Sequence, residues 1–178
     1  MPPRPLLIRA VPYDLPATSA MIGELQAYYR TLYDAPDPSP VDPQEFTPPA
    51  GRFFAGYLDD AAVAMGGWRW IEALPGIGAL RPVEIKRMYV ATSARGQGCA
   101  RRLLGHLEVT AHEAGADAVV LSTGPAQRDA IALYRSAGYD DVPKFGFFAA
   151  YEQAVHLGKR LTRMNAPVSG PRPDGTGR

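Results

Sequence analysis

Cysteine is almost absent from this sequence: Cys99 is the one cysteine among 178 residues. A single thiol cannot form a disulfide within the chain, so nothing indicates an oxidising, extracellular compartment. Long apolar runs are lacking as well. No window approaches the ~18 consecutive apolar residues that would cross a bilayer, and the first residues contain no long apolar segment of the kind found in secretion signals. We therefore expect a cytoplasmic protein with no membrane partner.

Neither sign of charge is in marked excess. The chain has 19 basic and 18 acidic residues and a formal net charge of +1, so no broad basic field is present and nucleic acid is not expected as a main partner. No group of His, Cys, Asp and Glu has the spacing of metal ligands, so no metal is expected. The length and the composition, 46% hydrophobic and 21% charged, fit one compact domain. A homodimer is compatible with the sequence, which does not determine the oligomeric state.

Hydrophobic periodicity predicts an alternation of strands and helices. We expect strands over 6–11, 52–58, 62–71, 83–90, 118–122, 139–142 and 154–161, and helices over 15–33, 99–114 and 126–137.

Three further expectations complete this outline. Asp14 is expected to cap the first helix, and the proline-rich residues 35–51 should form a loop with one short helical turn. The order of elements predicts one α/β domain over residues 1–161, with a mixed central sheet and helices on both faces. Residues 162–178, rich in Pro, Gly and Arg, are expected to form a disordered tail.

A glycine-rich loop precedes the helix that we expect to begin at residue 99. It reads Arg95-Gly96-Gln97-Gly98-Cys99-Ala100. Backbone N–H groups at a helix N-terminus are unpaired and carry the positive end of the helix dipole, and glycines let that backbone approach an anion. The loop therefore predicts a cradle for a diphosphate, to which Arg95 can add a charged contact.

Two better-known phosphate motifs do not fit this loop. The P-loop needs Gly-Lys-Ser/Thr, which the chain lacks. The dinucleotide fingerprint needs a third glycine where Arg101 stands and an acidic residue where Ser122 stands. The pattern that remains, Arg-x-x-Gly-x-Ala, is satisfied by Arg95, Gly98 and Ala100.

From Glu84 to about Tyr139 the chain resembles the GNAT N-acetyltransferases, and a weaker resemblance covers about 5–161. The similarity has three parts: a central strand, the loop at 95–100 and a second cofactor motif of the form A-x-x-L-Y-x-x-x-G-F/Y. The strand reads Lys86-Arg87-Met88-Tyr89-Val90, and the second motif reads Ala130-Ile131-Ala132-Leu133-Tyr134-Arg135-Ser136-Ala137-Gly138-Tyr139. The resemblance implies a GNAT-like fold.

The resemblance also implies acetyl-CoA as the co-substrate. It places the pantetheine arm in a splayed gap between two parallel strands and the pyrophosphate on the glycine-rich loop. Gln127 stands where many relatives carry Asn; its side chain can still donate and accept hydrogen bonds, but from a longer arm. The implied cofactor-binding residues are Met88, Tyr89, Val90, Arg95, Gly96, Gln97, Gly98, Cys99, Ala100, Gln127, Ala130 and Tyr134.

Acetyl transfer to an amine needs one group that takes a proton from the amine and one that protonates the departing thiolate. Tyr134 is the candidate donor, because family tyrosines at this motif position point at the CoA sulfur; the alternative is simple packing on the pantetheine arm. Glu84 is the candidate base or water-holder, because a covered strand normally excludes charge. The alternatives for Glu84 are exposure at the strand end or a salt bridge to Lys86, Arg87 or another basic residue.

The expected function is an acetyl-CoA-dependent N-acetyltransferase that transfers the acetyl group directly to a primary amine of a small molecule or peptide. Direct transfer needs no acyl-enzyme, so Cys99 is read as a small buried residue. The alternative is a non-catalytic CoA-binding regulatory module, which would tolerate loss of Tyr134 and Glu84. We expect the 35–51 and 144–152 loops to shape the acceptor entrance, and His156 either to pack or to touch the substrate.

Overall fold

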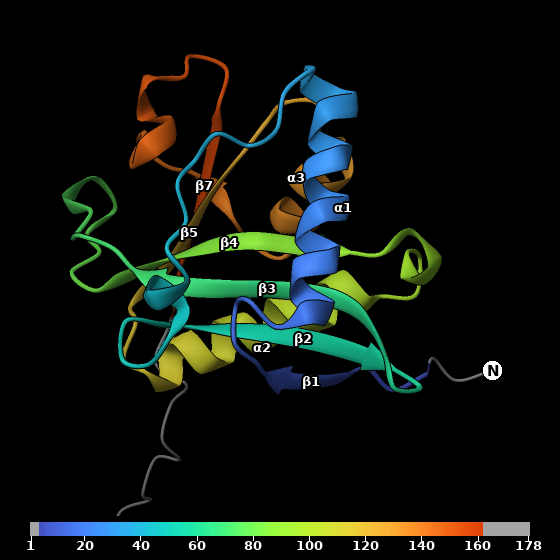
Figure 1. The fold of residues 1–178 in the computed structure, drawn as a ribbon. Helices are drawn as coiled ribbons and strands as arrows, with labels where there is room; N and C mark the ends of the chain where they lie inside the picture. The colour runs from blue at the N-terminus through green and yellow to red at the C-terminus, as the bar shows by residue number, and fades with distance from the viewer. Residues whose placement is uncertain (1–3, 162–178) are drawn as a thin grey trace, which may run out of the picture.

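A mixed β-sheet forms the centre of the computed structural model, which describes residues 4–161 (Figure 1). The strands are β1 (Leu7–Ala10), β2 (Gly51–Leu58), β3 (Ala61–Trp70), β4 (Pro82–Val90), β5 (Ala118–Thr123), β6 (Asp140–Asp141) and β7 (Val155–Arg160). The helices are α1 (Pro16–Tyr33), α2 (Cys99–Glu113) and α3 (Arg128–Ser136), with short 3-10 turns η1 (Pro43–Phe46), η2 (Pro75–Ile77), η3 (Thr92–Ala94) and η4 (Phe147–Ala150). In the described part of the chain the strand order is β1-β2-β3-β4-β5-β7-β6.

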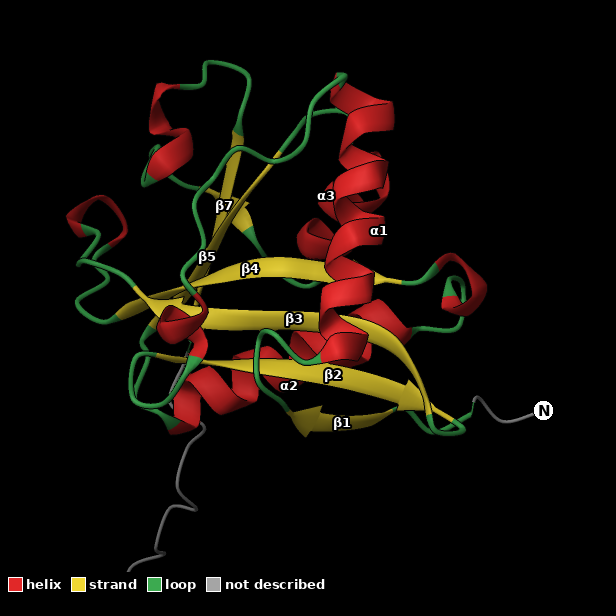
Figure 2. Cartoon of the chain, viewed as in Figure 1, coloured by secondary structure: helices red, strands yellow, loops and turns green. Residues whose placement is uncertain are grey.

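Helices cover both faces of this sheet, as predicted (Figure 2). α1 packs against β3 and β4 on one face, while α2 packs against β3, β4 and β5 on the other. α3 lies beside α2, where the guanidinium of Arg101 donates to the hydroxyl of Ser136. Neighbouring strands are antiparallel except for β4 and β5, which run parallel. The predicted fold class is therefore confirmed.

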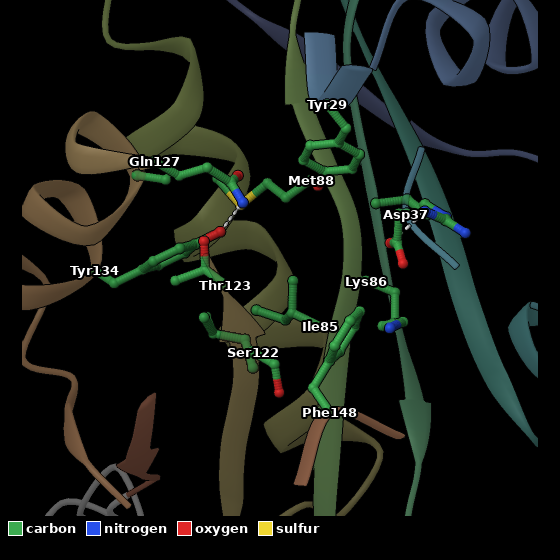
Figure 3. Close-up of a pocket in the computed structure, with 13 residues that line it drawn as sticks. Tyr29, Asp37, Ile85, Lys86, Met88, Ser122, Thr123, Gln127, Tyr134 and Phe148 are labelled. Carbon is green, nitrogen blue, oxygen red and sulfur yellow. Dashed lines mark hydrogen bonds and ion pairs between the residues drawn. The ribbon is translucent and has the colours of Figure 1, made fainter. Parts of the chain in front are cut away.

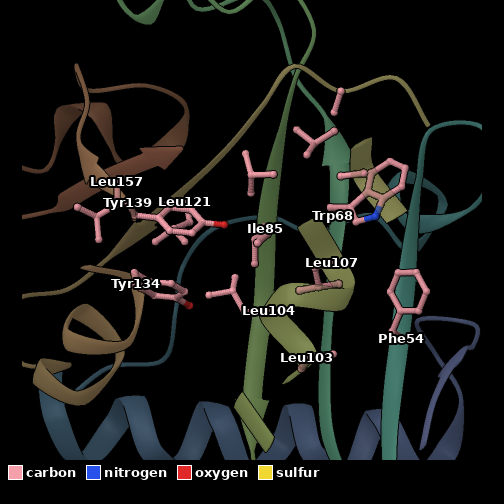
Figure 4. Packing of buried hydrophobic residues seen from close by; sticks show 14 of the residues in the cluster. Phe54, Trp68, Ile85, Leu103, Leu104, Leu107, Leu121, Tyr134, Tyr139 and Leu157 are labelled. Carbon is pink, nitrogen blue, oxygen red and sulfur yellow. The ribbon is translucent and has the colours of Figure 1, made fainter. Parts of the chain in front are cut away.

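The two faces are built by alternating side chains, because successive residues of a strand point to opposite sides of a sheet. In β2, Phe53 belongs to the cluster under α1 and Phe54 to the cluster under α2. Figure 4 shows the second cluster, where Leu103, Leu104 and Leu107 of α2 are buried against the sheet. Burying each of these leucines stabilises the fold by about 2 kcal/mol.

The start of α1 differs from the prediction. Leu15, not Asp14, occupies the N-cap position, and no side chain caps the helix there. Thr18, in the first turn, instead donates its hydroxyl to the carbonyls of Leu15 at 2.7 Å and Tyr13 at 2.8 Å. The expectation for Asp14 was therefore wrong: the helix begins one residue later than a cap at Asp14 requires, and the side-chain hydrogen bonds at its start come from Thr18.

β4 separates from β5 partway along its length. The parallel pairing joins Pro82–Glu84 to Ala118–Val120 and goes no further. On the opposite edge of β4 the register with β3 shifts between Met65 and Gly67, and Arg87 has a φ of +57°. Bulges of this kind bend the strand and increase its twist, which is consistent with β4 turning away from β5.

The predicted short turn in the proline-rich segment is present as η1. Asp42 caps it by accepting a hydrogen bond from the amide of Gln44 at 2.9 Å, and Glu45 bonds back to the amide of Asp42. The predicted disordered tail, 162–178, lies outside the described residues. Within residues 4–161, none of the helices has both the length and the apolar character that a membrane crossing requires.

Candidate active site

A narrow cavity of about 60 Å³ lies where β4 and β5 part (Figure 3). Its walls come from α1, β4, the end of β5, α3 and the loops that carry Asp37 and Phe148. Four of the predicted site residues line it: Met88, Gln127, Ala130 and Tyr134. The structure thus brings the central strand and the second motif to one place.

Tyr134 reaches across this cavity from α3. Its hydroxyl lies 3.7 Å from the sulfur of Met88 on β4 (Figure 3). The side chain is buried, and burial raises the pKa of the Tyr134 hydroxyl to about 12. The phenol is therefore protonated at neutral pH and can donate a proton to a base that forms beside it.

The glycine-rich loop leaves the start of α2 uncapped. Gly98 is the N-cap residue and makes no side-chain hydrogen bond to the first turn. Gly96 and Gly98 have φ values of +73° and +74°, and a Cβ built on either would meet no atom within 4 Å. Glycine is therefore required at these two positions by the left-handed backbone conformation and not by close neighbouring atoms. The space beside the first turn of α2 is open, and the amides of that turn have no intrahelical acceptor. Such amides fit the diphosphate of a coenzyme.

Side chains of the same loop have protein partners. Arg95 donates from Nε to the carbonyl of Val90 at 3.2 Å, and its guanidinium lies over the rings of Tyr28 and Tyr89. Gln97 accepts a hydrogen bond from Arg4 at 3.1 Å. Cys99 is buried at the first turn of α2, as expected for a packing residue.

Gln127 lies at the start of α3, with its amide nitrogen 3.5 Å from the hydroxyl of Tyr33 at the end of α1. Ala130 lines the cavity one turn further along α3. These positions bring the second motif to the wall of the gap that faces Met88.

Glu84 forms a salt bridge to basic residues, which is one of the alternatives that the sequence left open. It is buried, and its Oε2 accepts hydrogen bonds from Arg69 Nε at 3.1 Å and Nη2 at 3.0 Å. Its Oε1 lies 3.8 Å from Lys86 Nζ. Arg69 also pairs with Glu45 in η1. Glu84 thus belongs to a buried ion-pair network and is not among the residues that line the cavity.

Two basic residues of β4 join this site to the proline-rich loop. Lys86 Nζ donates to Ser39 Oγ at 3.0 Å and lies 5.4 Å from the centre of the Phe148 ring. Arg87 Nη1 donates to Asp37 Oδ2 at 2.6 Å. Burial is the largest influence on Lys86 and lowers the pKa of its ammonium group. The loops expected to shape the acceptor entrance therefore contribute side chains to the cavity.

From the sequence, Lys86 and Arg87 were read as part of a motif strand and as possible salt-bridge partners of Glu84. Their signal was present, because these two charges and Glu84 lie in a strand whose other residues are apolar or aromatic. Their partners were not predictable, since Ser39 and Asp37 lie in a segment without periodic structure.

A second polar pair joins the cavity wall to β7 through Ser122, which lines the cavity. His156, on β7, is 4% exposed, and its Nδ1 lies 3.1 Å from Ser122 Oγ on β5. Nε2 of His156 has no hydrogen-bond partner among the described residues. Burial lowers the pKa of the His156 imidazole, which is therefore neutral at pH 7. Phe145 packs against the ring at 5.1 Å between ring centres.

Comparisons with known proteins agree with this geometry. Residues 19–139 match the model of the acetyltransferase (GNAT) family. A protein of Azospirillum brasilense named IAA acetyltransferase is 37% identical over 145 residues, which are 82% of this chain and 91% of that protein.

Solved structures of the same family superpose on the chain. A Klebsiella pneumoniae protein assigned as an acyl-CoA N-acyltransferase has a TM-score of 0.72 and 28% identity, covering 88% of this chain and 98% of its own. A GNAT acetyltransferase of Elizabethkingia anophelis with acetyl-CoA bound has a TM-score of 0.62 and 18% identity, with the same two coverages.

A mixed sheet split between two parallel strands, with an open helix N-terminus behind the split, defines an α/β acyltransferase. The chain belongs to the acetyltransferase (GNAT) family, and it is an acetyl-CoA-dependent N-acetyltransferase. Within residues 4–161 no three His, Cys, Asp or Glu side chains lie close enough together to hold a metal ion.

Proposed function

We propose that this protein transfers the acetyl group of acetyl-CoA directly to a primary amine of a small molecule or peptide. One observation carries the proposal: β4 parts from β5 after Glu84, and the protonated hydroxyl of Tyr134 lies in the cavity between them, while the loop that follows β4 leads into the uncapped start of α2. The helix start suits the diphosphate of acetyl-CoA, and the proton donor suits its thioester.

The chain offers distinct groups for each part of the co-substrate. Among the described residues, β4 has no strand on its β5 side beyond Glu84. Main-chain groups of Met88, Tyr89 and Val90 would hold the pantetheine arm there, apart from the Val90 carbonyl, which accepts a hydrogen bond from Arg95. The amides from Gly96 to Ala100 would hold the diphosphate, with Arg95 beside them. Bound acetyl-CoA supplies the acetyl group as an activated thioester.

Tyr134 would protonate the departing thiolate. Burial raises the pKa of this phenol to about 12, so it carries its proton at neutral pH and can donate a hydrogen bond to the thiolate as negative charge develops on the sulfur. A main-chain N–H of the Met88–Val90 segment would donate to the carbonyl oxygen as negative charge develops there. The amine must lose a proton as its nitrogen bonds to the carbonyl carbon.

Glu84 remains our candidate base or water-holder for that proton. Arg69 donates two hydrogen bonds to Oε2 of Glu84, so Oε1 is the oxygen left to accept one from a water molecule. The carboxylate would then act through that water, because it does not line the cavity itself.

The alternative, a CoA-binding module without catalysis, does not explain why Tyr134 meets Met88 across the gap. An acetyl-CoA-dependent thiol-release screen over amines, amino acids, peptides and aminoglycosides separates the two. Because the Azospirillum relative is named an IAA acetyltransferase, IAA belongs in the first panel. Thiol release with an acceptor is the expected result. Binding of acetyl-CoA without thiol release in any reaction would favour the module.

Cytoplasmic localisation and a homodimer remain predictions. Cell fractionation tests the first, and light scattering on the purified protein tests the second.

A further inference from the structure

The β4 side of the cavity contains positively charged hydrogen-bond donors that the described residues leave partly unpaired. Lys86 and Arg87 both line it, and their side chains are 8% and 6% exposed. An ammonium group has three donors, but among the described residues Lys86 Nζ makes one hydrogen bond, to Ser39 Oγ. Its nearest carboxylate oxygen, Oε1 of Glu84, is at 3.8 Å, which is beyond hydrogen-bond distance.

Arg87, the next residue of β4, is likewise a buried cation with an unpaired donor. Its Nη1 donates to Asp37 and its Nη2 to the carbonyl of Ser39. Its Nε is buried and has no hydrogen-bond partner among residues 4–161. Buried donors are normally paired, so an unpaired guanidinium N–H beside an under-used ammonium group indicates an anionic ligand.

The net charge of the surrounding network narrows the class of ligand. Three cations face three carboxylates: Arg69, Lys86 and Arg87 against Asp37, Glu45 and Glu84. A simple alkylammonium ion would add an unbalanced positive charge beside two buried cations. A molecule that carries one amine and one carboxylate enters with no net charge, so the balance is kept.

We propose that the acetyl acceptor is a small amino-carboxylate whose carboxylate binds Lys86 Nζ and Arg87 Nε while its amine points toward Tyr134. Phe148, in the loop that follows β6, lies against the ammonium group of Lys86, so its ring would pack on the carbon skeleton of the acceptor. Hydroxyl groups of Ser122 and Thr123 line the opposite wall. This inference rests on the acetyltransferase function proposed above.

Matched trios of compounds test it: an amino acid, its carboxamide and the amine that lacks the carboxyl carbon, over a range of side chains. The expected result is that kcat/KM for the preferred amino acid exceeds that of its carboxamide and of its amine by at least about tenfold. Equal or better turnover of the carboxamide or the amine would overturn the proposal. So would acetyl-CoA binding with no turnover of any amino acid.

A binding measurement makes the test independent of turnover. Calorimetry on the CoA-loaded protein compares the N-acetylated amino acid with its carboxamide, and we expect the acid to bind at least about tenfold more tightly. In Lys86→Met this difference should disappear while acetyl-CoA binding is kept. Lys159→Met is the matched control, because Lys159 pairs with Glu108 away from the cavity, and it should keep the full difference.

The outcomes are separable from failure of the proposed function. If acetyl-CoA does not bind, the acetyltransferase mechanism fails first. If acetyl-CoA binds but the acid and the carboxamide bind alike to the wild-type protein, the carboxylate site is wrong and the acetyltransferase function stands. If Lys86→Met does not fold, the comparison of acid and carboxamide binding to the wild-type protein still decides whether the carboxylate site exists.

Discussion

The hydroxyl of Tyr134 on α3 lies 3.7 Å from the sulfur of Met88 on β4, so the two side chains meet across the gap between the parted strands. One side chain comes from the central strand and the other from the second motif. A thioester placed along β4 would therefore lie within reach of the phenol.

Replacing Tyr134 with Phe removes the donor and keeps the ring. General acid catalysis contributes about 100-fold or more to a rate, so we expect kcat to fall by about that factor while KM for acetyl-CoA stays similar. Steady-state kinetics measures both. Tyr139→Phe is the control, since Tyr139 is also buried and packs 5.7 Å from Tyr134 but does not line the cavity. Unchanged kcat in Tyr134→Phe would remove the acid role.

Gly98→Ala tests the diphosphate cradle. The left-handed conformation costs an L-residue roughly 1–2 kcal/mol, and Gly98 has a φ of +74°. We expect acetyl-CoA to bind about tenfold more weakly, which corresponds to about 1.4 kcal/mol, by calorimetry. Gly105→Ala is the matched control inside α2, where an added Cβ meets nothing within 4 Å and should stabilise the helix by up to about 1 kcal/mol. Equal binding by both variants would count against the cradle.

Glu84→Gln separates structure from catalysis. Breaking a buried ion pair by removing one partner costs about 3–5 kcal/mol, and Glu84 pairs with Arg69 and Lys86. We expect a clear loss of stability in urea. If Glu84 is also the base, the folded variant should lose the acidic limb of its kcat/KM profile with pH. An unchanged profile would place the base elsewhere.

His156 should make the fold sensitive to mild acid. Burial is the largest cause of its lowered pKa; nearby Lys144 also lowers it, while the Phe148 main chain and Glu84 oppose the shift. A folded-state pKa below the unfolded value of ~6.5 means that stability is fully present above that pH and is lost as pH falls. Urea unfolding at pH 7.5 and 5.5 should show a smaller loss in His156→Asn than in the wild type. Equal losses would show that His156 does not contribute.

Much of the fold could be predicted from local sequence patterns. The alternation of Phe53 and Phe54 and the apolar stripe of Leu103, Leu104 and Leu107 follow from the periods of strand and helix. The glycine-rich start of α2 was predictable for the same reason, because glycines directly before an amphipathic helix are a local signal; its role as a diphosphate cradle stays a prediction.

Long-range pairing accounts for what the sequence did not predict. Lys86 meets Ser39 across 47 positions and Arg87 meets Asp37 across 50. Neither partner carries a periodic signal, and the register shift that turns Arg87 depends on β3. The candidate base was ambiguous for a similar reason, since the pairing of Glu84 with Arg69 depends on strand register.

Titration calorimetry of the purified protein with acetyl-CoA tests the central claim most directly. The uncapped start of α2 and the parted strands predict saturable binding with a dissociation constant in the range of about 1 μM to 1 mM. The affinity should fall in Gly98→Ala but not in Gly105→Ala. Absence of binding by the folded wild-type protein at millimolar acetyl-CoA would contradict the account.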